Sequence, residues 1–217
     1  MHVRSRPIAD IHLSRHRQDM PADSSHEVIR PYPLITEAIR MGNWPETAHL
    51  LNRYPEMRTL NVPAFGSWLH YACARGTREI VAGLVSQGFE ASSKSERDEI
   101  TPLAFAASSG KAEIVDLLLG LGVPLDTSTS EGNPLFRAVL ARSEEVARAL
   151  LDAGIDTTPR YKLGSIGETV DAVAFAMLHG ARDLARLIAL RDGSGDEDNA
   201  RSAMDQGLRI AHAITSK

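Results

Sequence analysis

The sequence predicts an all-α solenoid of about five helix-turn-helix units, with short hairpin loops between units and a helix covering the C-terminal end. The first observation is a run of small and apolar residues at Thr101–Gly110, followed by a Leu-rich run at Ala112–Gly122, each ending in glycine. The second is that this phrase returns, with variations, at Ser67–Gly76 and Asn133–Arg142, so that its copies begin 34 and 32 residues apart. A nearly constant period of this length is typical of repeat proteins, whose units bury their apolar faces only by stacking.

The residue types within a unit explain why it should fold as two helices. Pro102 suits the first turn of a helix, where its missing N–H would have no partner anyway, and Thr101 or Ser67 can cap free amides. Gly110 and Gly76 predict a left-handed residue that ends the first helix. Alanines let the first helix lie close to its neighbours, and the second helix carries apolar residues at the spacing of a buried stripe. These are Ile114, Val115, Leu117 and Leu118.

Degenerate copies extend the repeats in both directions. One is at Tyr32–Gly42 and another at Asp171–Gly180, each followed by apolar residues for a second helix. The expected organisation is an irregular or flexible arm at 1–30, repeats over 31–190, and a linker plus capping helix at 191–217. The expected units are 32–62, 63–96, 97–128, 129–160 and 165–190.

The phrase resembles the ankyrin repeat, whose period is about 33 and whose core reads Thr-Pro-Leu-His-x-Ala. The second unit keeps Leu69-His70 and the third keeps Thr101-Pro102-Leu103. The resemblance covers roughly residues 32–190. It implies that His70 makes hydrogen bonds that tie neighbouring hairpins together, and that the protein binds a partner protein rather than catalysing a reaction. The run Gly66–His70 also resembles small stand-alone bacterial ankyrin proteins.

Three departures from the pattern are candidates for function. Trp68 replaces the proline of the phrase, and its indole either packs on the preceding unit or forms an interface anchor. Arg142 replaces a glycine, so the turn there is expected to be strained or differently shaped. The longer insert Ile155–Val170 separates the fourth and fifth units by 38 residues, and such a loop is a candidate contact.

Composition excludes several classes of protein. The chain has 217 residues, 43% hydrophobic content and a net charge of −4, which gives no reason to expect nucleic acid. It has no run of 18 apolar residues for a membrane span, and Met1–Met20 carries arginines but no apolar signal segment. Cys73 is the only cysteine and cannot form an intrachain disulfide, so we expect a cytoplasmic protein.

Candidate catalytic and metal-binding motifs are weak. Cys73 falls where the family usually has an inward-facing alanine, which favours a small buried residue over a nucleophile. His12 and His16 have the spacing of zinc ligands on a helix, but no glutamate follows His12 and no third ligand is near. Gly164–Thr169 lacks the Gly-Lys-Ser/Thr ending of a phosphate loop and is interpreted as a hairpin tip. We therefore predict no catalytic residue, cofactor, metal or small-molecule substrate.

The resemblance implies that the partner meets the concave side, formed by hairpin tips and the exposed face of the first helices. Equivalent inner positions include Leu140, Ala141 and Leu178, and the long insert is expected on the same side. The predicted partner-binding residues are Phe65, Trp68, Ala74, Arg75, Arg97, Asp98, Glu99, Ile100, Ser108, Ser109, Thr129, Glu131, Tyr161, Lys162 and His179.

The leading functional hypothesis is a non-enzymatic protein-binding module. Because proteins of this kind are often encoded beside secreted toxins, the sharpest version is an immunity-type inhibitor that binds a cognate toxin or effector. One alternative is a regulatory or host-directed scaffold for another folded protein. The other is an enzyme that uses the N-terminal arm or the loop at 155–170, which would need convergent titratable groups in a pocket.

Overall fold

A computed structural model of the protein describes residues 31–162, 169–193 and 195–216. Residues 31–217 form one compact unit. Three expectations lie outside the described residues: the N-terminal arm at 1–30, the His12 and His16 pair, and most of the Gly164–Thr169 segment.

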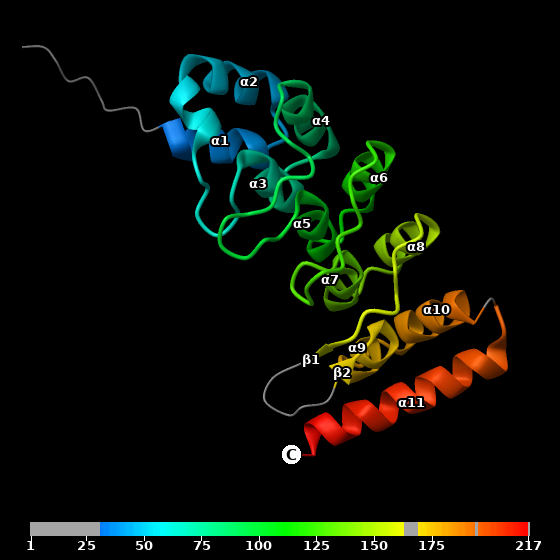
Figure 1. The fold of residues 1–217 in the computed structure, drawn as a ribbon. Coiled ribbons are helices and arrows are strands. Elements are labelled where there is room, and N and C mark those ends of the chain that lie inside the picture. The colour runs from blue at the N-terminus through cyan, green and yellow to red at the C-terminus, as the bar shows by residue number, and fades with distance from the viewer. Residues whose placement is uncertain (1–30, 163–168, 194, 217) are drawn as a thin grey trace, which may run out of the picture. The chain divides into compact units, whose positions relative to one another are not determined.

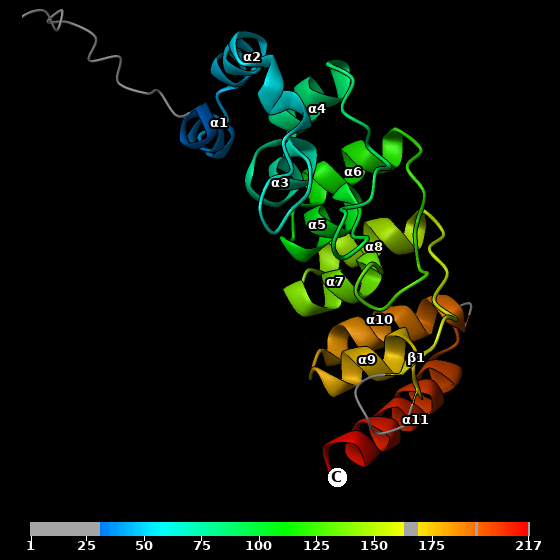
Figure 2. The same cartoon turned by 60° about the vertical axis from the view of Figure 1, so that its left-hand side comes forward.

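The described residues form five helix pairs followed by a single long helix, as expected for an all-α repeat solenoid (Figure 1). The first helices of the pairs pack side by side in one layer, and the second helices pack side by side in another (Figures 1 and 2). The first helices are α1 (Pro31–Arg40), α3 (Trp68–Arg75), α5 (Pro102–Ser108), α7 (Pro134–Ala141) and α9 (Ala172–Leu178). The second helices are α2 (Trp44–Arg53), α4 (Arg78–Ser86), α6 (Ala112–Gly120), α8 (Glu144–Asp152) and α10 (Arg182–Asp192).

The core lies between the two layers and repeats with the sequence. One alanine of each of the last four first helices is fully buried at the same position of the phrase: Ala72, Ala106, Ala138 and Ala176. Ile114, Val115 and Leu118 of α6 are also fully buried, as expected, whereas Leu117 is only half-buried at the edge of the core. Small residues in one layer let the large aliphatic side chains of the other reach across without voids.

The helix ends are satisfied as the sequence predicts, with one exception. The Thr101 hydroxyl accepts a hydrogen bond from the Ala104 N–H at 3.2 Å, and Gly110 adopts a left-handed φ of 65°. Gly76 does not, because its φ is −88°. A Cβ on Gly76 would lie 2.9 Å from the Ala72 carbonyl oxygen and 3.1 Å from Ile39 Cγ2. The expected left-handed residue is therefore wrong at Gly76, where glycine is needed for space against the preceding pair.

His70 ties neighbouring hairpins together, as the resemblance implies. Its Nδ1 accepts a hydrogen bond from the Ser67 N–H at 3.1 Å, and its Nε2 donates to the Ser93 carbonyl at 3.2 Å, in the loop that leads to the next pair. The side chain is 1% exposed, and burial lowers the pKa of His70 below its usual value. A neutral imidazole with one accepting and one donating nitrogen satisfies both bonds.

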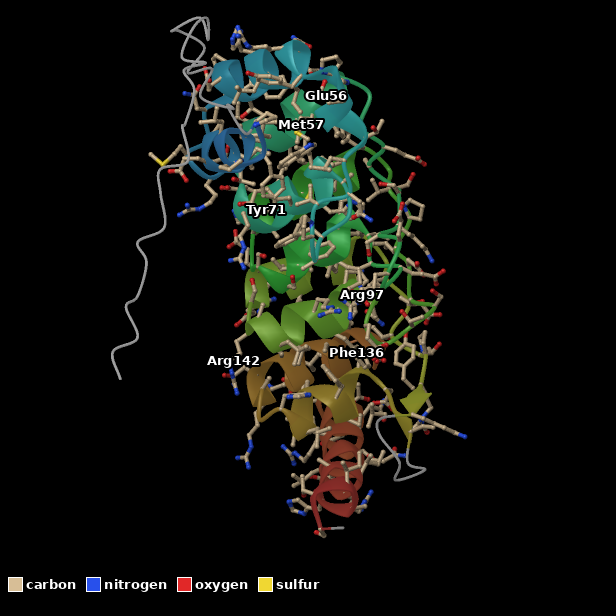
Figure 3. All side chains as sticks on the ribbon, turned by 90° about the vertical axis from the view of Figure 1, so that its left-hand side faces the viewer. Glu56, Met57, Tyr71, Arg97, Phe136 and Arg142 are labelled. Carbon is tan, nitrogen blue, oxygen red and sulfur yellow. The ribbon has the colours of Figure 1, made fainter. Side chains whose placement is uncertain are left out.

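The turn at Arg142 has the left-handed φ of the glycines at the same position in three other units, Gly42, Gly110 and Gly180. Its φ of 53° places a non-glycine residue in the left-handed region, which confirms the expected strain and rules out a differently shaped turn. The guanidinium reaches the turn of the next pair, where Nη2 donates to the His179 carbonyl at 2.9 Å (Figure 3). This bond between pairs offsets part of the backbone cost.

Trp68 packs on the preceding pair and is not an interface anchor. Its side chain is 0% exposed, and its ring centroid lies 5.5 Å from that of Tyr32 on α1. The indole N–H donates to the Met57 carbonyl at 2.6 Å, within the short 3-10 helix Pro55–Thr59 (Figure 3 labels Met57). Its inclusion among the partner contacts is therefore wrong.

The C-terminal helix α11 (Glu197–Thr215) covers the last pair by packing on α9 and α10 (Figure 1). The two helices α11 and α9 approach each other closely at Gly207, where an added Cβ would lie 3.1 Å from the Ala174 Cα. The linker before it is shorter than the expected Arg191–Asn199, because α10 continues to Asp192 and the Asp196 carboxylate caps α11 by accepting from the Asp198 N–H at 2.9 Å.

The long insert ends in two strands that the all-α prediction does not contain. Strand β1 (Tyr161–Lys162) pairs antiparallel with β2 (Thr169–Val170), with Tyr161 opposite Val170. None of the described helices has the length and apolar character that crossing a membrane requires.

Candidate protein-binding surface

Three hairpin tips project beside the first helices. They are Val62–Gly66, Ser95–Ile100 and Thr129–Asn133. Each is closed by a backbone bond between residues four apart: the N–H of Gly66, Glu99 or Asn133 donates to the carbonyl of Val62, Ser95 or Thr129 at 2.9–3.0 Å. Ala64 and Glu99 have left-handed φ values of 66° and 51°, so two of the tips hold non-glycine residues in a costly conformation.

A depression of about 590 Å³ lies between α3 and α5, and we call it the central depression. It joins five of the predicted contact residues: Phe65, Ala74, Arg75, Ser108 and Ser109. Phe105 and Lys111 complete its lining. The Phe65 and Phe105 rings lie 5.5 Å apart between centroids, so aromatic surface from two neighbouring repeats is continuous there.

A second depression of about 290 Å³ lies between α7 and α9, and we call it the distal depression. It joins the predicted residues Glu131 and His179 with Arg137, Leu140 and Phe175. Leu140 is 50% exposed, and the Phe175 ring lies 4.4 Å from the His179 ring between centroids. The combination of exposed apolar and polar side chains is typical of a binding surface.

The tips form a third hollow. It lies between the first two tips and is lined by Phe65 together with the predicted residues Arg97 and Asp98. Arg97 and Asp98 are exposed, and their charged atoms approach to 3.9 Å. Thr129 is half-buried at the third tip because its hydroxyl accepts from the Gly132 N–H at 2.9 Å.

Two further predicted contacts offer little surface. Ala74 is 6% exposed and Ile100 is 8% exposed, so their expected role at the interface is corrected. The reason for Ile100 is that it closes the tip, with its N–H bound to the Ser95 hydroxyl at 3.0 Å and its carbonyl to the Ser95 N–H.

The residues of the long insert divide between structure and surface. The Tyr161 hydroxyl accepts from the Asn133 side-chain amide at 3.0 Å and donates to the Thr127 carbonyl at 2.5 Å, and its ring packs edge-on against Phe136. Tyr161 therefore anchors the insert to the fourth repeat, whereas Lys162 is exposed.

Sequence reasoning missed Phe105, Arg137, Phe175 and Lys111. The first three occupy the fifth position of the repeated phrase, which is Tyr71 in the second unit. That position lies three residues before the predicted contact positions, so one helical turn of spacing places it on the same face. The signal was present in the alignment of the copies, and Lys111 follows the turn glycine directly.

The position of Cys73 does not suit a nucleophile. Cys73 is 0% exposed, and burial raises the pKa of its thiol far above the range of a reactive cysteine. Among the described residues, no group of three or more His, Cys, Asp or Glu side chains is placed to hold a metal ion.

The comparison with known families agrees with this architecture. A family model described as ankyrin repeats (3 copies) matches residues 69–161. The chain contains ankyrin repeats. The match spans α3–α8 and ends at β1, and the helix pairs α1–α2 and α9–α10 continue the ankyrin stack on either side. No curated protein matches the chain. Ankyrin repeats are in general non-enzymatic modules for protein–protein interaction, and the surface of this ankyrin protein is interpreted on that basis.

Proposed function

We propose that this ankyrin protein is a scaffold that binds a folded partner protein through the first-helix layer and the hairpin tips. The observation that carries the proposal is that the central and distal depressions both open on this layer and join side chains from successive repeats. A stacked repeat holds such side chains in place before binding, so little conformational entropy is lost on docking.

Direct contacts between repeats support a preformed surface. The Arg142 guanidinium binds the His179 carbonyl of the next turn, and the Lys111 amine binds the Gly76 carbonyl of the preceding turn. The turns that border both depressions are therefore fixed relative to one another. A protein partner that covers several repeats would bury an interface of about 1,600 Å², the standard size for a specific complex.

The finer proposal is an immunity-type inhibitor that covers the active site of a cognate toxin. Its support is the resemblance of Gly66–His70 to stand-alone bacterial ankyrin proteins. The experiment is co-expression with the product of a neighbouring toxin-like gene, followed by growth and co-purification. Protection of growth is expected; a partner that binds without being inhibited would identify a regulatory scaffold instead.

The concave-face proposal is tested with a blocking variant. Ser109→Trp adds an indole to the mouth of the central depression at an exposed position, and Asp116→Trp adds the same side chain on exposed α6 in the other layer. We expect Ser109→Trp to abolish co-purification of the partner and Asp116→Trp to preserve it, with equal thermal stability of the two variants. Equal binding by both variants would overturn the proposal.

A further inference from the structure

Charge is distributed unevenly between the two helix layers. The second helices α2, α4, α6, α8 and α10 carry nine carboxylates and six arginines. The first helices carry one carboxylate, Glu37, and three arginines. Lys111 and Arg142 in the turns that follow add two more cations to this layer. In a chain with a net charge of −4, the layer that bears the depressions is therefore locally basic.

The two groups of cations also differ in their partners. In the second-helix layer three of the six arginines, Arg148, Arg186 and Arg191, lie within 3.4 Å of a carboxylate oxygen. In the first-helix layer only Arg40 has such a partner, Glu37. Among the described residues, no carboxylate lies within 4.0 Å of the remaining first-layer cations, which are Arg75, Lys111, Arg137 and Arg142.

Three of these cations contact only backbone carbonyl groups. Arg137 donates to the Glu131 carbonyl at 2.6 Å, Arg142 to that of His179 at 2.9 Å, and Lys111 to that of Gly76. Burial lowers the pKa of Lys111, so its charge is partly desolvated, although the nearby Glu113 carboxylate opposes this shift. A carbonyl dipole orients a cation but leaves its net charge in place, so a carboxylate brought close by a partner would gain strong attraction.

Apolar and polar side chains both surround these cations, and Glu131 lines the distal depression. In the central depression Arg75 and Lys111 lie beside Phe65 and Phe105, with the hydroxyl of Ser109 at the edge. In the distal depression Arg137 lies beside Leu140 and Phe175. We propose that the partner presents an acidic segment, in which Asp or Glu side chains alternate with apolar ones, and that Arg75 and Lys111 receive its carboxylates in the central depression. This inference rests on the proposed scaffold function.

The same layer is a poor match for a nucleic acid. Double-stranded DNA carries one negative charge per about 1.7 Å of helix axis, so it needs a continuous basic track. Here the cations lie on different repeats and form no continuous track. The neighbouring tips also carry exposed carboxylates, which are those of Glu96, Asp98, Glu99 and Glu131. Isolated carboxylates on a protein segment can meet the separated cations and avoid these tips.

The test uses three fluorescent probes and two charge-reversal variants. The probes are a short peptide alternating Glu with Leu and Phe, the same peptide with Lys for Glu, and an oligothymidine. Arg75→Glu lies in the central depression, and Arg78→Glu is the matched control, exposed in the first turn of α4 in the other layer. Binding is measured by fluorescence anisotropy at low and high salt, and folding by circular dichroism.

We expect the acidic peptide alone to bind, with salt-sensitive affinity that falls at least about tenfold in Arg75→Glu and stays within about twofold in Arg78→Glu. Equal loss in both variants, or preferred binding of the basic peptide, would overturn the inference. Preferred binding of oligothymidine would replace it with a nucleic-acid site. If Ser109→Trp blocks the natural partner but Arg75→Glu binds it as well as Arg78→Glu, the scaffold function stands and the acidic-segment inference fails.

Discussion

Replacing Trp68 tests whether the most unusual residue of the repeat serves stability rather than binding. The indole is 0% exposed, packs against Tyr32 at 5.5 Å and Tyr71 at 6.2 Å between ring centroids, and donates to the Met57 carbonyl at 2.6 Å. Trp68→Ala removes all three contacts and should lower the free energy of unfolding by about 3–5 kcal/mol. Trp68→Phe keeps an aromatic ring but leaves the Met57 carbonyl without its partner, and should cost about 1–3 kcal/mol.

The assay is urea unfolding followed by circular dichroism, with Trp44→Phe as the control. Trp44 is half-buried on α2, and its ring packs over Gly83, where an added Cβ would lie 2.5 Å from the ring atoms. Trp44→Phe should lower the free energy of unfolding by less than Trp68→Phe does. The reasoning would be refuted if both Trp68 variants stayed within about 0.5 kcal/mol of the wild type, the range of ordinary surface substitutions, while partner binding fell.

Three further substitutions test individual features of the stack. Arg142→Ala loses the bond to the His179 carbonyl and keeps a Cβ on a left-handed backbone, whereas Arg142→Gly loses the bond but removes the Cβ. Urea unfolding should therefore show the glycine variant to be more stable by about 1 kcal/mol. Equal unfolding midpoints of the two variants would exclude backbone strain at residue 142. Burial lowers the pKa of His70 in the folded protein. As the pH falls from about 7 to 5, the unfolded chain therefore binds a proton at His70 before the folded chain does, and the free energy of unfolding should decline. His70→Gln should flatten that decline, and an unchanged slope would contradict it. Gly207→Ala would place a Cβ 3.1 Å from the Ala174 Cα and should lower the melting temperature, despite the higher helix propensity of alanine. The control Gly120→Ala should not lower it, because the added Cβ would have no atom within 4 Å. A raised melting temperature for Gly207→Ala would show that α11 is less closely packed.

Local chemistry was sufficient to predict the helices, because every unit repeats the same caps and apolar positions. Thr101 caps α5 as expected from the residue type alone, and the aliphatic stripe of α6 is buried as its spacing indicates. The role of Gly76 could not be predicted in this way, since an added Cβ would meet both the Ala72 carbonyl oxygen of its own helix and Ile39 of the preceding repeat. The short strands β1 and β2 were missed because two residues each are too few to show an alternating pattern.

The position of the two depressions was predictable from the repeat, but the exposure of individual residues was less so. The tips and the ends of the first helices do border the central and distal depressions, yet Ala74 is buried while its neighbour Arg75 is exposed. One residue turns a helix by about 100°, so exposure depends on how each helix is rotated against the next layer, which the period alone does not specify. Among the described residues no carboxylate lies within 4.0 Å of Arg75 or Arg137, and this depends on contacts between repeats that the sequence does not show.

Hydrogen exchange with and without the isolated protein partner tests the central claim most directly. Binding through the first-helix layer should slow amide exchange in the Ser95–Ile100 and Thr129–Asn133 tips and at the C-terminal ends of α3, α5 and α7, and leave α4, α6 and α8 unchanged. Slower exchange confined to the second helices, with no change at the tips, would contradict it.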